Sequence, residues 1–144
     1  MTQSNSDTTQ RLRFSLVPLK ESTDKRGSLC VIDPSDGQFP FEVKRVFWIT
    51  GVPEGEVRGD HAHRSCSEVI VPLRGSFVAH VNDGRETADF LMDDHRQGLF
   101  IPPMVWCSFS HFSADCICLC LASEGYGPEG YIDSLEDYLK EVRL

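Results

Sequence analysis

Two histidines in a short glycine-flanked segment are the residues of this chain best suited to chemistry. The segment from Gly55 to Gly75 reads GEVRGDHAHRSCSEVIVPLRG and places His61 and His63 two residues apart. Because side chains alternate between the two faces of a β-strand, both imidazoles would leave the same face of a strand. A neutral imidazole is a good base near pH 7 and an imidazolium is a good acid, so the pair is suited to proton transfer on one ligand.

The elements that must position this pair are short strands. Segments rich in apolar, β-branched and aromatic residues, separated by turn residues, predict strands over residues 14–19, 28–32, 43–50, 68–73, 76–81, 88–92, 98–101, 104–112 and 116–122. Only residues 133–144 have helical spacing, with Asp133 or Ser134 as the cap. Many short strands and one terminal helix predict an all-β antiparallel barrel in a single domain, residues 13–144, after a polar tail over residues 1–12 that we expect to be disordered.

Composition excludes several classes of partner. The formal charge of −8 argues against a nucleic-acid binder, which needs a basic face to neutralise phosphates. No apolar run approaches 18 residues, and the polar N-terminus does not resemble a signal peptide. We therefore expect a cytoplasmic protein that binds neither membranes nor nucleic acid.

The six cysteines do not have the spacing of a disulfide framework or of a structural zinc site. Cys116, Cys118 and Cys120 alternate with apolar residues and would share one face of a strand. We expect them to be free thiols packed in the core, as small hydrophobic side chains of a protein in a reducing compartment.

The spacing of the histidine segment resembles the first signature of the cupins, which are small β-barrel proteins. The pattern is Gly55, five residues, His61-x-His63, four residues, Glu68, six residues, Gly75. A metal-binding cupin adds a histidine from a second signature, but residues 102–107 read PPMVWC, with Cys107 where that histidine would stand. Two interpretations remain open at this point. Either His61, His63, Glu68 and Cys107 bind a metal, or Glu68 pairs with a nearby cation and no metal is required.

A longer set of segments resembles one group of cupins more specifically. RGSL at 26–29, FPFEVKRVFWI at 39–49, RGDHAH at 58–63, GLFIPPMVW at 98–106 and LASEGYGPEGYI at 121–132 look like the dTDP-4-keto-6-deoxyhexose 3,4-ketoisomerases. The resemblance implies a barrel that moves a ketone from C4 to C3 of a nucleotide-linked sugar, with no metal or other cofactor. It also implies a homodimer in which an N-terminal strand is exchanged.

The same resemblance suggests which residues carry the reaction. His61 and His63 would be the acid–base pair, and Arg58 matches an arginine of the family. The candidates for binding the substrate are basic and aromatic residues of the chain, namely Arg26, Lys44, Arg45, Trp48, Arg74, Trp106, Tyr126 and Tyr131.

The chain departs from the family in three ways, one of which is GPEG at 127–130 in place of part of a more acidic tail. Phe47 and Trp48 have no phenol where tyrosines are common, so a hydroxyl role must be absent or met by Tyr126 or Tyr131. Glu68 stands where the family commonly has glutamine. The alternative functions are therefore a metal-dependent cupin enzyme and a non-catalytic nucleotide-sugar binder.

Overall fold

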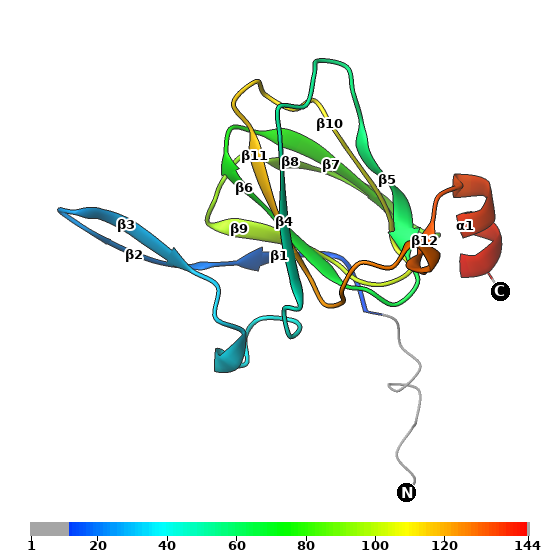
Figure 1. The fold of residues 1–144 in the computed structure, drawn as a ribbon, viewed down its shortest axis with the longest axis horizontal. Coiled ribbons are helices and arrows are strands. Elements are labelled where there is room, and N and C mark those ends of the chain that lie inside the picture. Colours follow the sequence, from blue (N-terminus) through cyan, green and yellow to red (C-terminus); the bar gives the residue numbers. More distant parts are fainter. Residues whose placement is uncertain (1–11, 144) are drawn as a thin grey trace, which may run out of the picture.

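Two five-stranded antiparallel sheets face each other in the computed structural model, which describes residues 12–143 (Figure 1). One sheet has the strand order β1-β9-β6-β11-β4, and the other has the order β12-β5-β10-β7-β8. This is the predicted cupin architecture with a short C-terminal helix. The strands are β1 (Ser15–Pro18), β2 (Lys20–Asp24), β3 (Gly27–Val31), β4 (Arg45–Thr50), β5 (Arg58–His63), β6 (Glu68–Arg74), β7 (Phe77–Asn82), β8 (Thr87–Met92), β9 (Gln97–Ile101), β10 (Trp106–Ser110), β11 (Ile117–Ala122) and β12 (Tyr131–Ile132).

The strand predictions are confirmed with shifts of a few residues at their ends, but β2 and β12 were not predicted. The β2 sequence, KESTD, has no apolar alternation, and all five residues are exposed. The two-residue strand β12 exists because it pairs with β5, which no local pattern reveals. Except for Leu12, the tail predicted over residues 1–12 lies outside the described residues.

An arm extends away from the barrel (Figure 1). It is the hairpin of β2 and β3, which form a two-stranded sheet of their own. Every residue of both strands is exposed, including Leu29 at 66% and Val31 at 40%. Apolar side chains left uncovered in this way are typical of a surface that contacts another protein.

Apolar residues and thiols fill the barrel between the two sheets. Cys118 lies opposite Ile49, and Cys120 lies opposite Phe47, in the pairing of β11 with β4. Cys116, Cys118 and Cys120 are all buried, as predicted. The sulfur atoms of Cys118 and Cys120 are 3.9 Å apart, well beyond the disulfide length of about 2.05 Å. These thiols therefore pack as core side chains.

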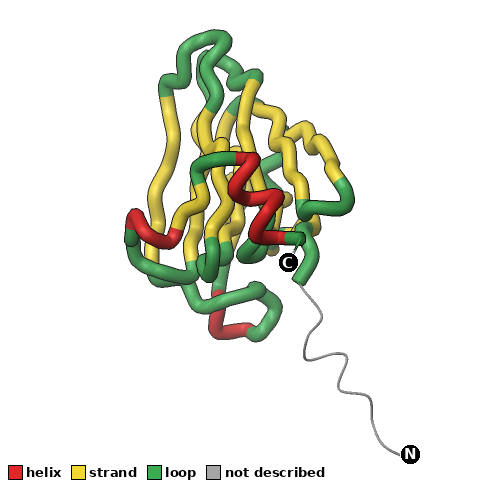
Figure 2. The backbone as a smooth tube through the Cα atoms, turned by 90° about the vertical axis from the view of Figure 1, so that its right-hand side faces the viewer, coloured by secondary structure: helices red, strands yellow, loops and turns green. Residues whose placement is uncertain are grey.

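The helix α1 (Leu135–Val142) covers the outer side of β5 and β10 (Figure 2). Ser134 is its N-cap, since its hydroxyl accepts a hydrogen bond of 3.2 Å from the Asp137 backbone N–H. Tyr138 packs against Trp106, with the ring centroids 5.8 Å apart. Within residues 12–143, no helix is long and apolar enough to cross a membrane.

Candidate active site

Strand pairing brings both histidines to the interior of the barrel together with a tyrosine. In β5, His61 lies opposite Cys107 of β10, and His63 lies opposite Tyr131 of β12. Residues directly opposite each other on paired strands share a face. The ring centroids of His61 and His63 are 4.9 Å apart, and those of Tyr131 are 4.9 Å from His61 and 4.5 Å from His63. The phenol of Tyr131, from a distant segment, therefore lies next to the predicted histidine pair.

A bulge in β5 sets the direction of His61. The register skips Asp60, because Cys107 pairs with His61 while Ser108 pairs with Gly59. Gly59 and Asp60 both have positive φ, 76° and 65°. A Cβ atom on Gly59 would lie 3.1 Å from the Phe109 ring and 3.2 Å from the Cys107 carbonyl oxygen, so a larger residue would force these neighbours to shift by a few tenths of an ångström.

A carboxylate from the facing sheet completes this cluster. Glu68 and Arg45 both lie opposite Ala122 of β11, on its two neighbouring strands, and therefore share one face. Glu68 Oε1 is 3.4 Å from His63 Nε2. Both residues are buried, and His63 Nε2 has no hydrogen-bond partner among the described residues. A buried polar atom without a partner is costly, which marks His63 Nε2 as a group available to a ligand.

A cavity of about 330 Å³ opens onto His63. Its lining includes Arg45, Tyr126 and Tyr131, three of the predicted substrate-binding residues. The Arg45 guanidinium lies 5.1 Å from the Phe47 ring centroid and 5.8 Å from that of Tyr126. The other lining side chains were not predicted from the sequence. They come from the segments after β5 and β11 and are Ser65, Cys66, Glu124 and Glu129. Their only local signal is the glycine-rich run GYGPEG, which is typical of a loop.

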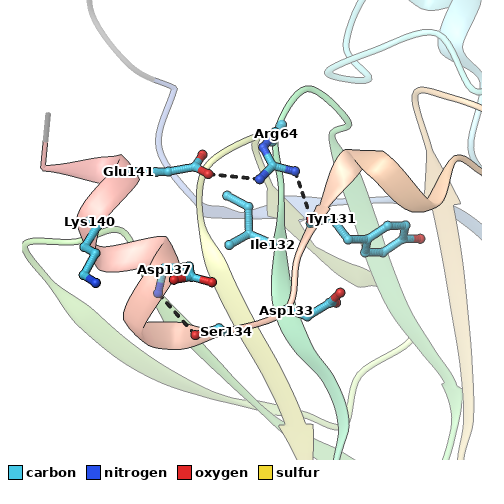
Figure 3. Close-up of a pocket in the computed structure, with 8 residues that line it drawn as sticks. All are labelled: Arg64, Tyr131, Ile132, Asp133, Ser134, Asp137, Lys140 and Glu141. Carbon is cyan, nitrogen blue, oxygen red and sulfur yellow. Dashed lines mark hydrogen bonds and ion pairs between the residues drawn. The ribbon is translucent and has the colours of Figure 1, made fainter.

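Arg64 holds the segment that carries Tyr131 (Figure 3). Its Nη1 donates to the backbone oxygens of Glu129 and Tyr131 at 2.9 Å and 3.0 Å, and its Nη2 donates to Glu141 of α1 at 2.9 Å. In this view the Tyr131 ring points away from α1. Arg64 therefore positions the loop from outside while the phenol faces the histidines.

Burial determines the charge of the His61 ring. Desolvation lowers the pKa of His61 below its ordinary value of 6.5, and the neighbouring His63 lowers it further. Glu68, Asp133 and a hydrogen bond to the Gly59 backbone oppose the shift, but they do not outweigh it. His61 is therefore neutral at pH 7 and able to accept a proton.

Three of the four proposed metal ligands come together. Donor atoms of His61, His63 and Glu68 all lie within 4.8 Å of one another, so these residues fit as ligands of a metal ion. Cys107 is not part of this group of described residues, and its thiol is fully buried. Burial raises the pKa of Cys107 well above its ordinary value, which disfavours the thiolate that a metal requires.

Several predicted residues lie elsewhere. Trp48 is 65% exposed and lines, together with Arg58, a separate hollow of about 490 Å³. Trp106 is buried beneath α1, on the face of β10 opposite to that of Cys107. Neither tryptophan lines the cavity at His63.

The remaining predicted cations do not line the cavity at His63 either. Arg74 ends β6 and lies 3.6 Å from Asp115, about 20 Å along the strand from Glu68, which begins it. Arg26 lies in the turn of the arm, paired with Asp24 at 2.6 Å. Lys44 precedes β4, where its backbone N–H donates to the Ala122 carbonyl.

Comparison with known proteins relates this geometry to a family. The FdtA family, described as "WxcM-like, C-terminal", matches residues 13–143. This chain belongs to that family. A relative from Aneurinibacillus thermoaerophilus, TDP-4-oxo-6-deoxy-alpha-D-glucose-3,4-oxoisomerase, is 34% identical over 132 residues, which cover 90% of this chain and 94% of the relative.

Solved structures of sugar 3,4-ketoisomerases are similar to this chain over most of its length. QdtA, a sugar 3,4-ketoisomerase from Thermoanaerobacterium thermosaccharolyticum solved in complex with TDP, is 33% identical with a TM-score of 0.86 over 90% of this chain and 94% of its own. A histidine-to-asparagine variant of that enzyme, in complex with TDP-4-keto-6-deoxyglucose, has a TM-score of 0.87 at 31% identity, covering 93% and 96%. A 3,4-ketoisomerase from Helicobacter canadensis is 29% identical with a TM-score of 0.86, covering 92% and 99%.

Replacing Gly59 with alanine should destabilise the protein and displace His61. Gly55 also has a positive φ, 85°, but a Cβ atom there would meet nothing within 4 Å. Gly55→Ala should therefore cost only the backbone strain, about 1–2 kcal/mol. Gly59→Ala should cost about 1–3 kcal/mol more, from crowding against Phe109. Chemical denaturation of both variants measures the difference, and equal losses would contradict this account of the bulge.

Proposed function

We propose that this chain is a 3,4-ketoisomerase of a TDP-4-keto-6-deoxyhexose. The observation that supports it most directly is the interior group of His61, His63 and Tyr131, in which His63 Nε2 has no hydrogen-bond partner among residues 12–143. Membership of a family whose relatives are named as 3,4-ketoisomerases supports the same reaction.

The reaction moves two protons and the pair of electrons of a C–H bond. A base removes the proton from C3, the electrons form a C3–C4 double bond, and the C4 oxygen takes a proton, which gives an enediol. The C3 hydroxyl then loses its proton while C4 gains one, so that the ketone stands at C3. Each step needs a group that can accept and return a proton near neutral pH, which is the chemistry of imidazole.

The geometry suggests separate roles for the two histidines. His61 is neutral because burial lowers its pKa, so it is suited to accept the first proton. His63 Nε2 lies 3.4 Å from Glu68 Oε1, so a protonated His63 would form an ion pair with that carboxylate. We assign the donation of a proton to the sugar to His63.

Arg45 and Tyr131 would stabilise negative charge on the sugar oxygens. Arg45 shares the cavity with His63, and its buried Nε has no hydrogen-bond partner in the described part of the chain. The Tyr131 phenol supplies a hydroxyl in place of the one that Phe47 lacks. Donors fixed in place before the reaction stabilise an enediolate without reorganisation. We retain Arg58 and Trp48, which share the second hollow, as candidates for binding the nucleotide.

The decisive assay follows TDP-4-keto-6-deoxyglucose by NMR after the protein has been dialysed against a chelator. We expect the 3-keto sugar to form at an unchanged rate, because the proposed chemistry uses only side chains. His61→Asn and His63→Asn should each reduce turnover by about 10²–10⁴-fold, the usual contribution of a positioned acid or base. His80→Asn is the matched control, since His80 is paired with Asp89 at 2.6 Å on β7 and β8, outside the cavity.

Each alternative predicts a different result in this assay. Loss of turnover on chelation, restored by a divalent metal, would favour the metal-dependent enzyme with His61, His63 and Glu68 as ligands. Tight binding without turnover would favour the nucleotide-sugar binder. Near-normal turnover in both histidine variants would refute the assignment of the pair.

The pH dependence of kcat/KM should report the neutral form of His61. Its pKa is lowered from 6.5, so the base form persists as the pH falls below that value. We therefore expect the acid limb of the profile to have its midpoint below pH 6.5. Since kcat/KM reports groups of the free enzyme, a midpoint above 6.5 would contradict His61 as the starting base.

We propose that the chain forms a homodimer through its arm. The strand expected to be exchanged, β1, pairs with β9 of the same chain. The arm of β2 and β3 instead exposes Leu29 and Val31 and is better suited to pack on a second copy. Light scattering should show a dimer, and Leu29→Asp should weaken it while Leu91→Asp, on an exposed face of β8, should not. A monomeric wild-type protein would contradict this assembly.

A further inference from the structure

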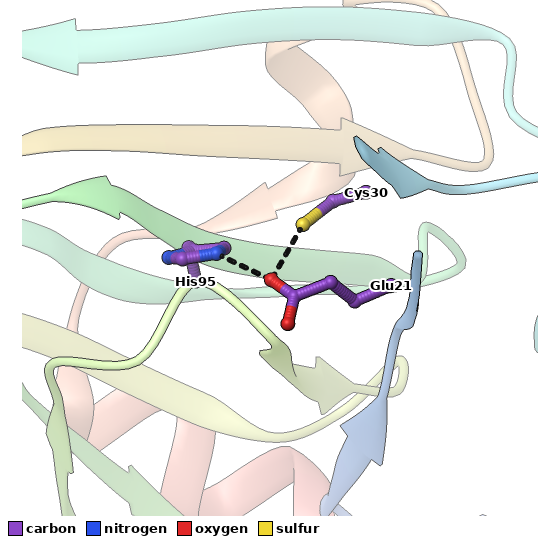
Figure 4. Close-up of side chains that lie close together, drawn as sticks. All are labelled: Glu21, Cys30 and His95. Atoms are coloured by element: carbon purple, nitrogen blue, oxygen red, sulfur yellow. Dashed lines mark hydrogen bonds and ion pairs between the residues drawn. The ribbon is translucent and has the colours of Figure 1, made fainter. Parts of the chain in front are cut away.

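A second group of potential metal ligands lies at the base of the arm, outside the barrel (Figure 4). Glu21 and Cys30 are directly opposite each other on β2 and β3, so their side chains share a face. His95 comes from the connection between β8 and β9. Three elements therefore bring a carboxylate, a thiol and an imidazole to one point, although Glu21 and His95 are 74 residues apart in sequence.

The side chains of His95 and Cys30 both contact the same carboxylate oxygen of Glu21. Glu21 Oε2 is 3.0 Å from His95 Nε2 and 3.4 Å from Cys30 Sγ, and the three donor atoms all lie within 4.8 Å of one another. Tetrahedral zinc, with bonds of about 2.0–2.3 Å, would place oxygen about 3.4 Å from nitrogen and about 3.6 Å from sulfur. The two distances to Glu21 Oε2 need to open by only a few tenths of an ångström to hold such an ion.

The surrounding charges leave the carboxylate available. Lys20, next to Glu21, is paired with Asp36 at 2.6 Å. Arg96, next to His95, acts on Glu21 only through its charge, because its guanidinium is held by Asp94 at 3.0 Å and 3.1 Å. The Glu21 side chain is 20% exposed and that of His95 is 47% exposed, so an ion could enter from solvent. By contrast, the exposed pair of His80 and Asp89 is not part of any group of three potential ligands among the described residues.

We propose that Glu21, Cys30 and His95 bind a borderline-soft divalent ion of the zinc class. Desolvation and Glu21 raise the pKa of the free Cys30 thiol, so the ion itself would have to stabilise the thiolate. Cys30 would release its proton to solvent on binding, and water would complete the tetrahedron. Sulfur and nitrogen ligands favour zinc over magnesium or calcium. The ion would link both strands of the arm to the barrel, adding to the hydrogen bond of 2.8 Å from Leu19 N–H to the Arg96 carbonyl. The site is separate from the proposed catalytic cavity, and all three ligands come from one chain.

Cobalt titration of untagged, reduced, chelator-dialysed protein tests the site. Cobalt(II) bound to a thiolate gives a near-ultraviolet charge-transfer band, and the His61, His63 and Glu68 group has no sulfur with which to produce one. We expect one equivalent of cobalt to produce the band and zinc to displace it. Cys30→Ser should abolish the band, and His95→Gln should weaken binding by at least about 100-fold, the upper end of what loss of a second-shell partner costs.

His80→Gln is the matched control and should bind like the wild type, with circular dichroism confirming that each variant is folded. Absence of the band in the wild type would overturn the proposal. Persistence of the band in Cys30→Ser would also overturn it, because the sulfur would then come from another cysteine. Neither result bears on the ketoisomerase, whose turnover is measured separately on chelator-dialysed protein.

Discussion

The pairing of β5 with its two neighbours is the constraint on which the candidate active site depends. β10 and β12 hold β5 on either side, so that His61, His63 and Tyr131 share the interior face. Because side chains alternate along a strand, a slip of one residue would turn both imidazoles out of the barrel. The bulge at Gly59 and Asp60 absorbs an extra residue before the histidines and so fixes where that alternation begins.

Burying polar rings inside an apolar barrel is unfavourable, but the same burial gives the rings properties that the proposed reaction needs. Glu68 and His63 are both buried, and a buried ionisable pair costs several kcal/mol in desolvation before its attraction is counted. The apolar and thiol-rich remainder of the barrel provides the burial that offsets this cost. The same low-polarity surroundings lower the pKa of His61 and strengthen interactions with developing charge.

The departure at Phe47 has a structural explanation. Phe47 faces the interior opposite Cys120 and contacts the Arg45 guanidinium, so its place in the barrel is occupied by an aromatic ring without a hydroxyl. Tyr131 enters from β12, on the other sheet, and brings a phenol beside both histidines. The group that could meet the hydroxyl requirement thus comes from a different element, which only the pairing of β12 with β5 reveals.

The sequence by itself determined the barrel class, the histidine pair and the interior position of the cysteine strand. These features depend on alternation with a period of two and on turn residues, both of which are local properties of the chain. Arg45, Tyr126 and Tyr131 could also be predicted from the sequence as substrate-binding residues. The same prediction included basic residues and tryptophans that do not line the cavity at His63. Tertiary structure decided which of these meet at His63, because Arg45 and Glu68 share a face only through Ala122 of the strand between them. It also decided that Glu21, Cys30 and His95 meet, since a contact across 74 residues is set by how the sheets close and leaves no trace in local spacing.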